Sequence, residues 1–277
     1  METLTRAATL RERVRSWRKD GRRIALVSTT GSLHKGHMSV IAEAQERANR
    51  VIVSIAHPAD PESPTLEADR DLLQKIGADV LFVPPVHELH PFGADASASV
   101  DVPSLSSVLE GLVRPGCLAA VATLHSKLFN LAAPDLALFG ERDFQRYLVV
   151  KRMVEDLFIP VEIAACTTLR ESDGLAFASA NRRLAKPERA LAARLFATLS
   201  QYAKRIDAGE RQFAALESEG LANLAALGLT PEYFAIRQAA DLAPVRAGTR
   251  ELVLLGAVRF GAIRLIDAVR TRVIERH

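Results

Sequence analysis

Short apolar runs and segments with helical spacing alternate along the first two thirds of the chain. The runs at residues 24–27, 51–55, 80–83, 136–139 and 161–165 predict strands, and the segments 38–48, 66–76, 118–131 and 144–157 predict helices. Short continuous apolar runs are typical of strands that are buried on both faces of a sheet. The pattern therefore predicts an α/β fold, in which a doubly wound parallel sheet carries helices on both faces.

The last third of the chain has a different pattern. Helices are predicted at 187–203 and 213–227 and strands at 233–237, 251–258 and 263–269, with residues 259–261 as the turn between the last two strands. This order predicts a smaller C-terminal α+β domain. The domain boundary is expected between Leu175 and Pro187, and we place the two domains at residues 1–178 and 179–277.

Two further segments carry local predictions. Leu4, Leu10, Val14 and Trp17 fall at helical spacing, which predicts an amphipathic first helix. Residues 94–107, ADASASVDVPSLSS, are mostly small and polar, which predicts a flexible loop.

Composition narrows the class of protein. The chain is 48% hydrophobic and 25% charged, with a mean hydropathy of +0.07, which is typical of a globular protein. No segment approaches the roughly 20 apolar residues of a membrane helix, and the basic N-terminus lacks the apolar core of a signal peptide. Cys117 and Cys166 are far apart, which favours reduced thiols in a cytoplasmic protein. The net charge of +3 is small and the arginines are scattered, so a nucleic acid is not an expected partner. A membrane is not an expected partner either, because the long apolar segment is missing.

The first candidate site is the segment VSTTGSLHKGHMSV, residues 27–40, where a predicted strand leads into a helix. Backbone N–H groups and the dipole at a helix N-terminus favour anions, and His34 and His37 at i and i+3 share one face. A phosphate site is therefore favoured. A zinc pair is an alternative, although no third ligand stands at a suitable spacing. Two ordinary surface histidines are the other alternative. The P-loop and dinucleotide-binding signatures are absent.

Two more segments follow predicted strands and so belong to the edge where such sheets bind ligands. In LALFGERDFQR, residues 136–146, Arg142 can neutralise phosphate charge, and Asp143 can hold a nucleotide or magnesium. Asp143 can equally be a simple helix N-cap. The segment 167–184, TTLRESDGLAFASANRRL, is either a solvated linker or a binding loop.

Together these segments resemble the pantothenate synthetase family, within the HIGH-type nucleotidyltransferase superfamily. HKGH matches the family's His-x-Gly-His motif, and KLFNLAAPDLALFGERDFQ and LRESDGLAFASANRRL continue the likeness over most of the chain. The resemblance implies a Rossmann-like N-terminal domain, a C-terminal domain that acts as a lid, and a homodimer. It also implies the use of ATP and Mg²⁺. In the implied reaction a carboxylic acid and ATP form an acyl adenylate, and an amine then displaces AMP.

The resemblance also implies roles for individual residues. The implied catalytic residues are His34 and His37, which stabilise charge as pyrophosphate leaves, and Arg142, which stands where the family has a lysine. No residue is assigned as a metal ligand. The implied ATP-binding residues are Gly31, His34, His37, Gly140, Asp143, Ser179 and Asn181.

This chain is a divergent member, and some of its departures concern the acid-binding pocket. Thr30 replaces a methionine that lines this pocket, and Arg146 replaces a glutamine that holds pantoate. A second such glutamine has no counterpart in the shortened segment 57–69, HPADPESPTLEAD. Because polar pockets discriminate strongly, these changes suggest that Thr30 and Arg146 bind a different, more acidic acyl substrate.

Other departures concern ATP. Ala178 and Ala180 replace a serine and an arginine of the family's phosphate loop, and Arg182 and Arg183 are the nearby candidates to compensate. We therefore expect an AMP-forming carboxylate–amine ligase that uses a small-molecule acid and amine. The alternatives are an ordinary pantoate–β-alanine ligase, a nucleotidyltransferase that stops at the adenylate, and a nucleotide-binding homologue that has lost activity.

Overall fold

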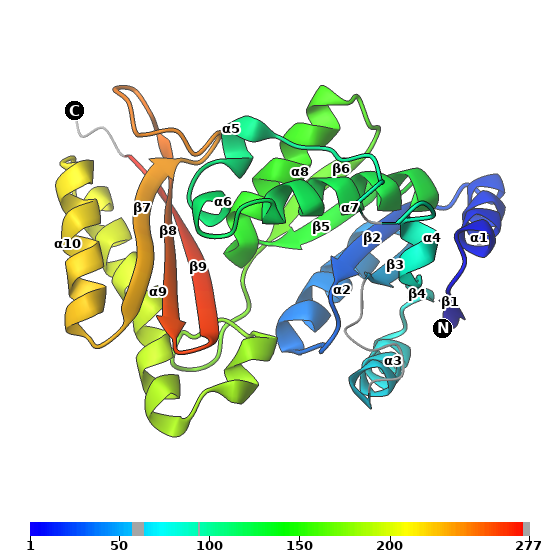
Figure 1. Cartoon of the computed structure of the whole chain (residues 1–277), viewed down its shortest axis with the longest axis horizontal. Coiled ribbons are helices and arrows are strands. Elements are labelled where there is room, and N and C mark those ends of the chain that lie inside the picture. The colour runs from blue at the N-terminus through cyan, green and yellow to red at the C-terminus, as the bar shows by residue number, and fades with distance from the viewer. Residues whose placement is uncertain (57–63, 94, 274–277) are drawn as a thin grey trace.

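The computed structural model describes residues 1–56, 64–93 and 95–273. Its larger sheet has six parallel strands in the order β1-β4-β3-β2-β5-β6, which confirms the predicted Rossmann-like, doubly wound sheet (Figure 1). The strands are β1 (Glu2–Leu4), β2 (Ile24–Thr29), β3 (Arg50–Ile55), β4 (Val80–Phe82), β5 (Leu136–Gly140) and β6 (Glu162–Cys166).

Helices cover both faces of this sheet because its strands are apolar on both sides. Ile24 and Leu26 of β2 face one core, whereas Ala25 and Val27 face the other. The first core packs against α1 (Ala7–Lys19), α7 (Cys117–Ala132) and α8 (Phe144–Asp156). The second packs against α2 (Lys35–Arg47) and α3 (Pro64–Ile76). The strand order reverses at β2, between β3 and β5, and the crevice beyond such a reversal is where these sheets bind ligands.

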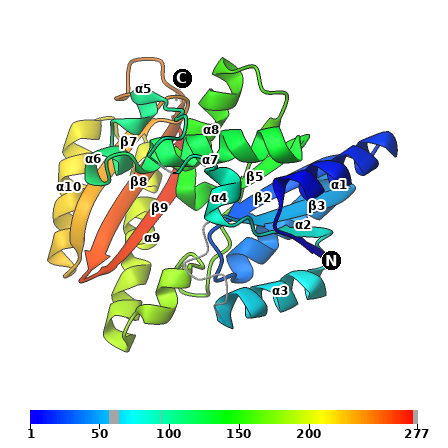
Figure 2. The same cartoon turned by 45° about the vertical axis from the view of Figure 1, so that its right-hand side comes forward.

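The C-terminal domain is α+β, as predicted. Its antiparallel sheet has the order β7-β8-β9, formed by β7 (Thr230–Gln238), β8 (Glu251–Phe260) and β9 (Ile263–Arg272). The helices α9 (Lys186–Asp207) and α10 (Phe213–Ala226) lie beside this sheet in Figures 1 and 2. Leu199 and Tyr202 of α9 are fully buried in the shared core.

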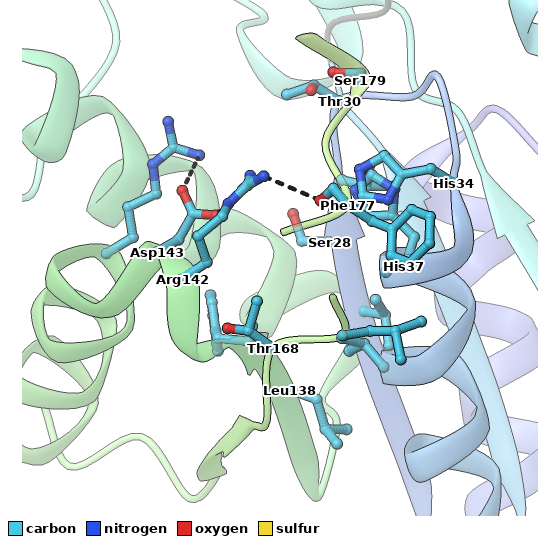
Figure 3. A pocket seen from close by; sticks show the side chains of 18 of the residues that line it. Ser28, Thr30, His34, His37, Leu138, Arg142, Asp143, Thr168, Phe177 and Ser179 are labelled. Atoms are coloured by element: carbon cyan, nitrogen blue, oxygen red, sulfur yellow. Dashed lines mark hydrogen bonds and ion pairs between the residues drawn. The ribbon is translucent and has the colours of Figure 1, made fainter. Parts of the chain in front are cut away.

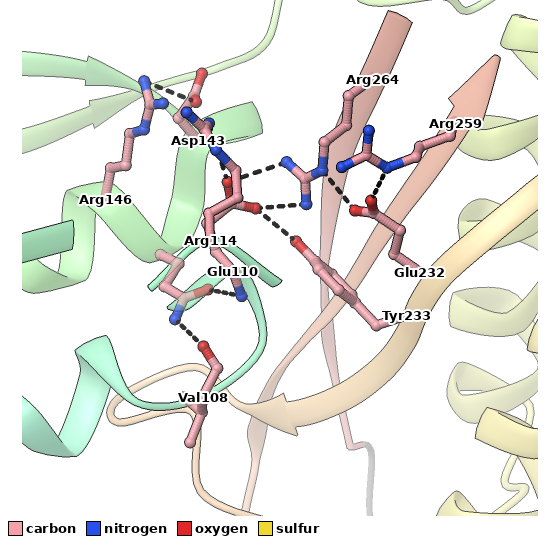
Figure 4. Close-up of polar contacts among 10 residues, drawn as sticks. Val108, Glu110, Arg114, Asp143, Arg146, Glu232, Tyr233, Arg259 and Arg264 are labelled. Atoms are coloured by element: carbon pink, nitrogen blue, oxygen red, sulfur yellow. Dashed lines mark hydrogen bonds and ion pairs between the residues drawn. The ribbon is translucent and has the colours of Figure 1, made fainter. Parts of the chain in front are cut away.

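A buried polar cluster joins the two domains (Figure 4). Its centre is Glu110 of the short helix α6 (Glu110–Val113), which is 4% exposed. Arg264 of β9 donates from Nη1 and Nη2 to the Glu110 carboxylate at 3.0 and 2.7 Å, and also pairs with Glu232 of β7. The Tyr233 hydroxyl lies 3.5 Å from the same carboxylate. Both domains therefore contribute to one ion-pair network.

Three local predictions need correction. Leu4 is not on the first helix: residues 2–4 form β1, which pairs with β4, and the helix begins at Ala7. The predicted loop 94–107 contains the helix α5 (Pro103–Ser106), which is ordered because Val102 and Leu105 are buried. The predicted turn 259–261 is shorter, because β8 continues to Phe260.

Other predictions are not decided by the fold. Residues 57–63 of the shortened segment lie outside the described residues, and the boundary between residues 178 and 179 stays a prediction. A further short helix, α4 (Val86–Leu89), follows β4. None of the helices in the described part of the chain combines the length and apolarity needed to cross a bilayer.

Candidate active site

A pocket of about 250 Å³ lies at the carboxyl ends of β2 and β5, where the strand order reverses (Figure 3). Its walls come from the β2–α2 connection, the β5–α8 connection, the segment that follows β6, and one face of α7. Of the ten predicted site residues, Asn181 alone is outside this lining. The pocket brings together Thr30, Gly31, His34, His37, Gly140, Arg142, Asp143, Arg146 and Ser179.

The two histidines of HKGH form a stacked pair at the start of α2. Their ring centroids are 4.0 Å apart, and Nε2 of His37 lies 3.3 Å from Oγ1 of Thr29. The glycine between them leaves room for this stacking, because a Cβ on Gly36 would lie 3.1 Å from the His34 ring. A larger residue at position 36 would crowd the His34 ring, and this explains the glycine in the motif.

Both imidazoles are neutral at pH 7. Burial, and then the nearby cation of Arg142, lowers the pKa of His34 to about 4. Burial, followed by the neighbouring His34 and Arg142, lowers the pKa of His37 to about 3. The Nδ1 atoms of both rings are buried and have no hydrogen-bond partner among the described residues. Each ring therefore carries one polar atom that is unsatisfied within the described residues.

A buried carboxylate that the sequence analysis missed holds the turn before the histidines. Asp69 of α3 is 3% exposed, and it accepts hydrogen bonds from the backbone N–H groups of Ser32 and Leu33 at 2.7 and 2.6 Å. Gly31 has a φ of +86°, and a Cβ there would lie 3.2 Å from Oδ2 of Asp69. The turn therefore needs a glycine at 31 and a carboxylate at 69.

Asp143 is the anion of the site and lies beside Arg142 in Figure 3. Its carboxylate pairs with Arg142 at 3.1 Å and with Arg146 at 3.5 Å. Burial opposes ionisation of Asp143, but the charges of Arg142 and Arg146 outweigh it and lower its pKa. Asp143 does stand at the N-cap position of α8, but its side chain makes no capping hydrogen bond there.

The loop after β6 closes the pocket from the side of the C-terminal domain. Arg142 donates from Nη1 to the Phe177 carbonyl at 3.1 Å, which ties this loop to the β5–α8 connection. Ser179 is exposed and lines the pocket, and its predicted binding of ATP stays a prediction. The Asn181 amide instead donates to the Ala176 carbonyl at 2.9 Å, within its own loop. Its role in ATP binding therefore stays a prediction.

Arg182, a candidate to compensate for the phosphate-loop arginine that Ala180 replaces, adds a cation to the site. It belongs to the 3₁₀ turn η2 (Ser179–Arg183), and its Nη2 donates to the Leu33 carbonyl at 3.1 Å. Its charge also contributes to the lowered pKa of His34. Arg142 and Arg182 therefore place two guanidinium groups close to the histidine pair.

This arrangement suits a polyanion such as a polyphosphate. Guanidinium groups bind phosphate oxygens with paired hydrogen bonds, and neutral imidazoles can donate without charge repulsion from the arginines. The described residues contain no group of three or more His, Cys, Asp or Glu side chains that could hold a metal ion. Protein ligands for Mg²⁺ are therefore not identified, although this ion is commonly held largely by substrate phosphates and water.

The comparisons with known proteins agree over almost the whole chain. The family described as pantoate-beta-alanine ligase matches residues 2–270. Pantothenate synthetases of Nitrosococcus oceani and Pseudomonas putida are each 41% identical, over 98% and 100% of this chain and 98% and 99% of theirs. The pantothenate synthetase structure from Thermus thermophilus has a TM-score of 0.86 at 34% identity, covering 97% of this chain and 99% of that one.

The pantoate-beta-alanine ligase of Francisella tularensis, solved with a βγ-ATP compound and β-alanine, has a TM-score of 0.78 at 25% identity. It matches over 97% of both chains. The family match extends over both domains and includes every segment that lines the pocket. The chain belongs to the pantoate–β-alanine ligase family and has the fold of an ATP-using C–N ligase.

Proposed function

We propose that the chain joins pantoate to β-alanine at the expense of ATP, with AMP and pyrophosphate as the other products. The observation that carries this proposal is the pocket itself, where the histidine pair, Arg142 and Asp143 converge at the strand reversal. The full-length identity of 41% to pantothenate synthetases supports it further. The hypothesis of a different acid, based on Thr30 and Arg146, finds no support in these comparisons, which favour the ordinary ligase.

In the first step a pantoate carboxylate oxygen attacks the α-phosphorus of ATP, and the bond to the leaving pyrophosphate breaks. Negative charge grows on the phosphate oxygens, and His34, His37 and Arg142 supply donors on that side of the pocket. Because both imidazoles are neutral and buried before ATP binds, their N–H groups are already in place.

In the second step the amine of β-alanine attacks the acyl carbon of the adenylate, and AMP leaves with the former carboxylate oxygen. A proton is lost from the amine as the amide forms. Asp143 stays ionised between its arginines and can accept hydrogen bonds from the nucleotide. Arg142 is oriented by its hydrogen bonds to Asp143 and the Phe177 carbonyl.

Pyrophosphate exchange into ATP tests the proposal. Purified protein with Mg²⁺ and pantoate is expected to exchange label, and added β-alanine is expected to release AMP and pantothenate in equal amounts. A panel of other carboxylic acids provides the comparison. Exchange with another acid but not with pantoate would support the different-acid hypothesis. Exchange with none would indicate a homologue that has lost activation, as Ala178 and Ala180 first suggested.

The family resemblance also implies a homodimer in the cytoplasm. We include the dimer in the proposal, and sedimentation equilibrium of the purified chain tests it. A mass close to twice the 30.2 kDa of one chain is expected.

A further inference from the structure

One polar side chain of the pocket wall has no role in ATP activation. His125 of α7 is 7% exposed and lines the pocket beside Val121, Leu124 and Phe139. Its ring centroid lies 5.1 Å from that of Phe139. A histidine in such an apolar wall requires an explanation, because each of its ring nitrogens needs a hydrogen-bond partner when buried.

The hydrogen bonding of His125 fixes the form of the ring. Nδ1 lies 2.7 Å from the backbone carbonyl of Val121. A carbonyl oxygen can only accept, so Nδ1 must carry a proton. Burial lowers the pKa of His125 to about 4, so the ring holds one proton at pH 7. Nε2 is therefore an unprotonated acceptor, and it is buried without a partner among the described residues.

We propose that Nε2 of His125 accepts a hydrogen bond from a hydroxyl group of the acid substrate and thereby selects hydroxy acids. The proposal rests on the function proposed above and adds a specificity-determining residue to it. Pantoate suits this wall, because it carries hydroxyl groups next to two methyl groups. The methyl groups can contact Val121 and Leu124 while a hydroxyl donates to Nε2.

The surroundings of His125 argue against other ligand groups. A carboxylate would be repelled, because Nε2 presents a lone pair and no proton. The ammonium group of β-alanine would have to leave water for an apolar wall that also lies within the field of Arg146. Arg146 lines the same pocket and suits the carboxylate of the acid. A hydroxy acid can satisfy both side chains at once.

Two acids that lack one hydroxyl each, 2-deoxypantoate and 4-deoxypantoate, test the proposal. The measured quantity is kcat/KM for pyrophosphate exchange, as the ratio of pantoate to each analogue. The unaltered protein is expected to prefer pantoate over one analogue by about tenfold or more, the value of one well-placed hydrogen bond. In His125→Leu that ratio is expected to fall close to one. His125→Gln, whose amide oxygen can accept, is expected to restore part of it.

The control is His87→Leu, the same substitution at an exposed histidine outside the pocket, which should leave both ratios unchanged. An unchanged ratio in His125→Leu would overturn the proposal, as would a change in the KM for ATP alone. If His125→Leu does not fold, the ratios of the unaltered protein and of His125→Gln decide. Equal use of all three acids by the unaltered protein overturns the proposal. Failure of the unaltered protein to activate pantoate would overturn the proposed function itself.

Discussion

Removing Arg264 should destabilise the contact between the two domains more than any exposed ion pair would. The Glu110 side chain is 5% exposed and that of Arg264 14%, and two hydrogen bonds of 3.0 and 2.7 Å join them. In Arg264→Met the Glu110 carboxylate keeps, among the described residues, the half-exposed Arg114 and the Tyr233 hydroxyl, each at 3.5 Å (Figure 4). Glu232 loses a partner as well.

Breaking one side of a buried pair costs about 3–5 kcal/mol, because the remaining charge stays buried. Glu110 keeps two weaker partners, so we expect the lower end, about 3 kcal/mol. For a chain of this size each kcal/mol lowers Tm by about 2–4 °C, which predicts a fall of about 6–12 °C in Arg264→Met. Differential scanning calorimetry of the apo protein measures this shift.

A double-mutant cycle separates the ion pair from simple loss of packing. The double variant Glu110→Gln, Arg264→Met leaves no unpaired charge at position 110. At least half of the decrease in Tm seen in Arg264→Met should therefore be recovered. Arg259→Met is the matched control, because Arg259 also pairs with Glu232 but its side chain is 44% exposed. This control is expected to cost at most about 1 kcal/mol. Additive losses in the double variant would refute the reasoning.

The remaining predictions concern the pocket. In Asp69→Asn one of the two carboxylate acceptors becomes an amide donor that faces a buried backbone N–H. The free energy of unfolding should therefore fall by about 1–3 kcal/mol in thermal unfolding. An unchanged Tm would contradict the role of Asp69 in holding the turn. His37→Asn should slow pyrophosphate exchange by about 10²–10³ while its Tm stays close to that of the parent; near-normal exchange would remove His37 from catalysis. His34, His37 and His125 have lowered pKa values of about 4, 3 and 4, against 6.5 when unfolded. Because the unfolded chain then binds more protons, their contribution to stability is complete above pH 6.5 and falls as pH drops toward 4; a Tm that stays constant through this range would argue against buried neutral rings.

The sheet and the motif residues could be predicted because their signals are local. Each strand of the large sheet from Ile24 onward is mostly apolar, with polar residues such as Ser54 and Glu162 as exceptions, and the HKGH segment lies shortly after one of them. The short strand at Glu2–Leu4 could not be predicted in this way. Leu4 fits the spacing of the first helix, and only pairing with β4, about 78 residues along the chain, makes it a strand.

The supporting residues of the site were harder to predict because their partners are distant in sequence. Asp69 lies on the buried stripe of α3 with Leu66 and Leu73, and an acidic residue at such a position is the one local signal it gives. His125 looks like a core position of an apolar helix until the bond to Val121 fixes its tautomer. Glu110 and Arg264 are 154 residues apart, so neither predicts the other.

Transfer of oxygen from the acid to AMP tests the central claim most directly. Pantoate labelled with ¹⁸O in its carboxylate is incubated with the protein, ATP, Mg²⁺ and β-alanine, and the masses of the products are measured by mass spectrometry. An acyl adenylate of pantoate predicts AMP that carries one ¹⁸O atom, unlabelled pyrophosphate, and pantothenate with one ¹⁸O in its amide. Label in inorganic phosphate, unlabelled AMP, or no AMP at all would contradict the assignment of this chain as a pantoate–β-alanine ligase.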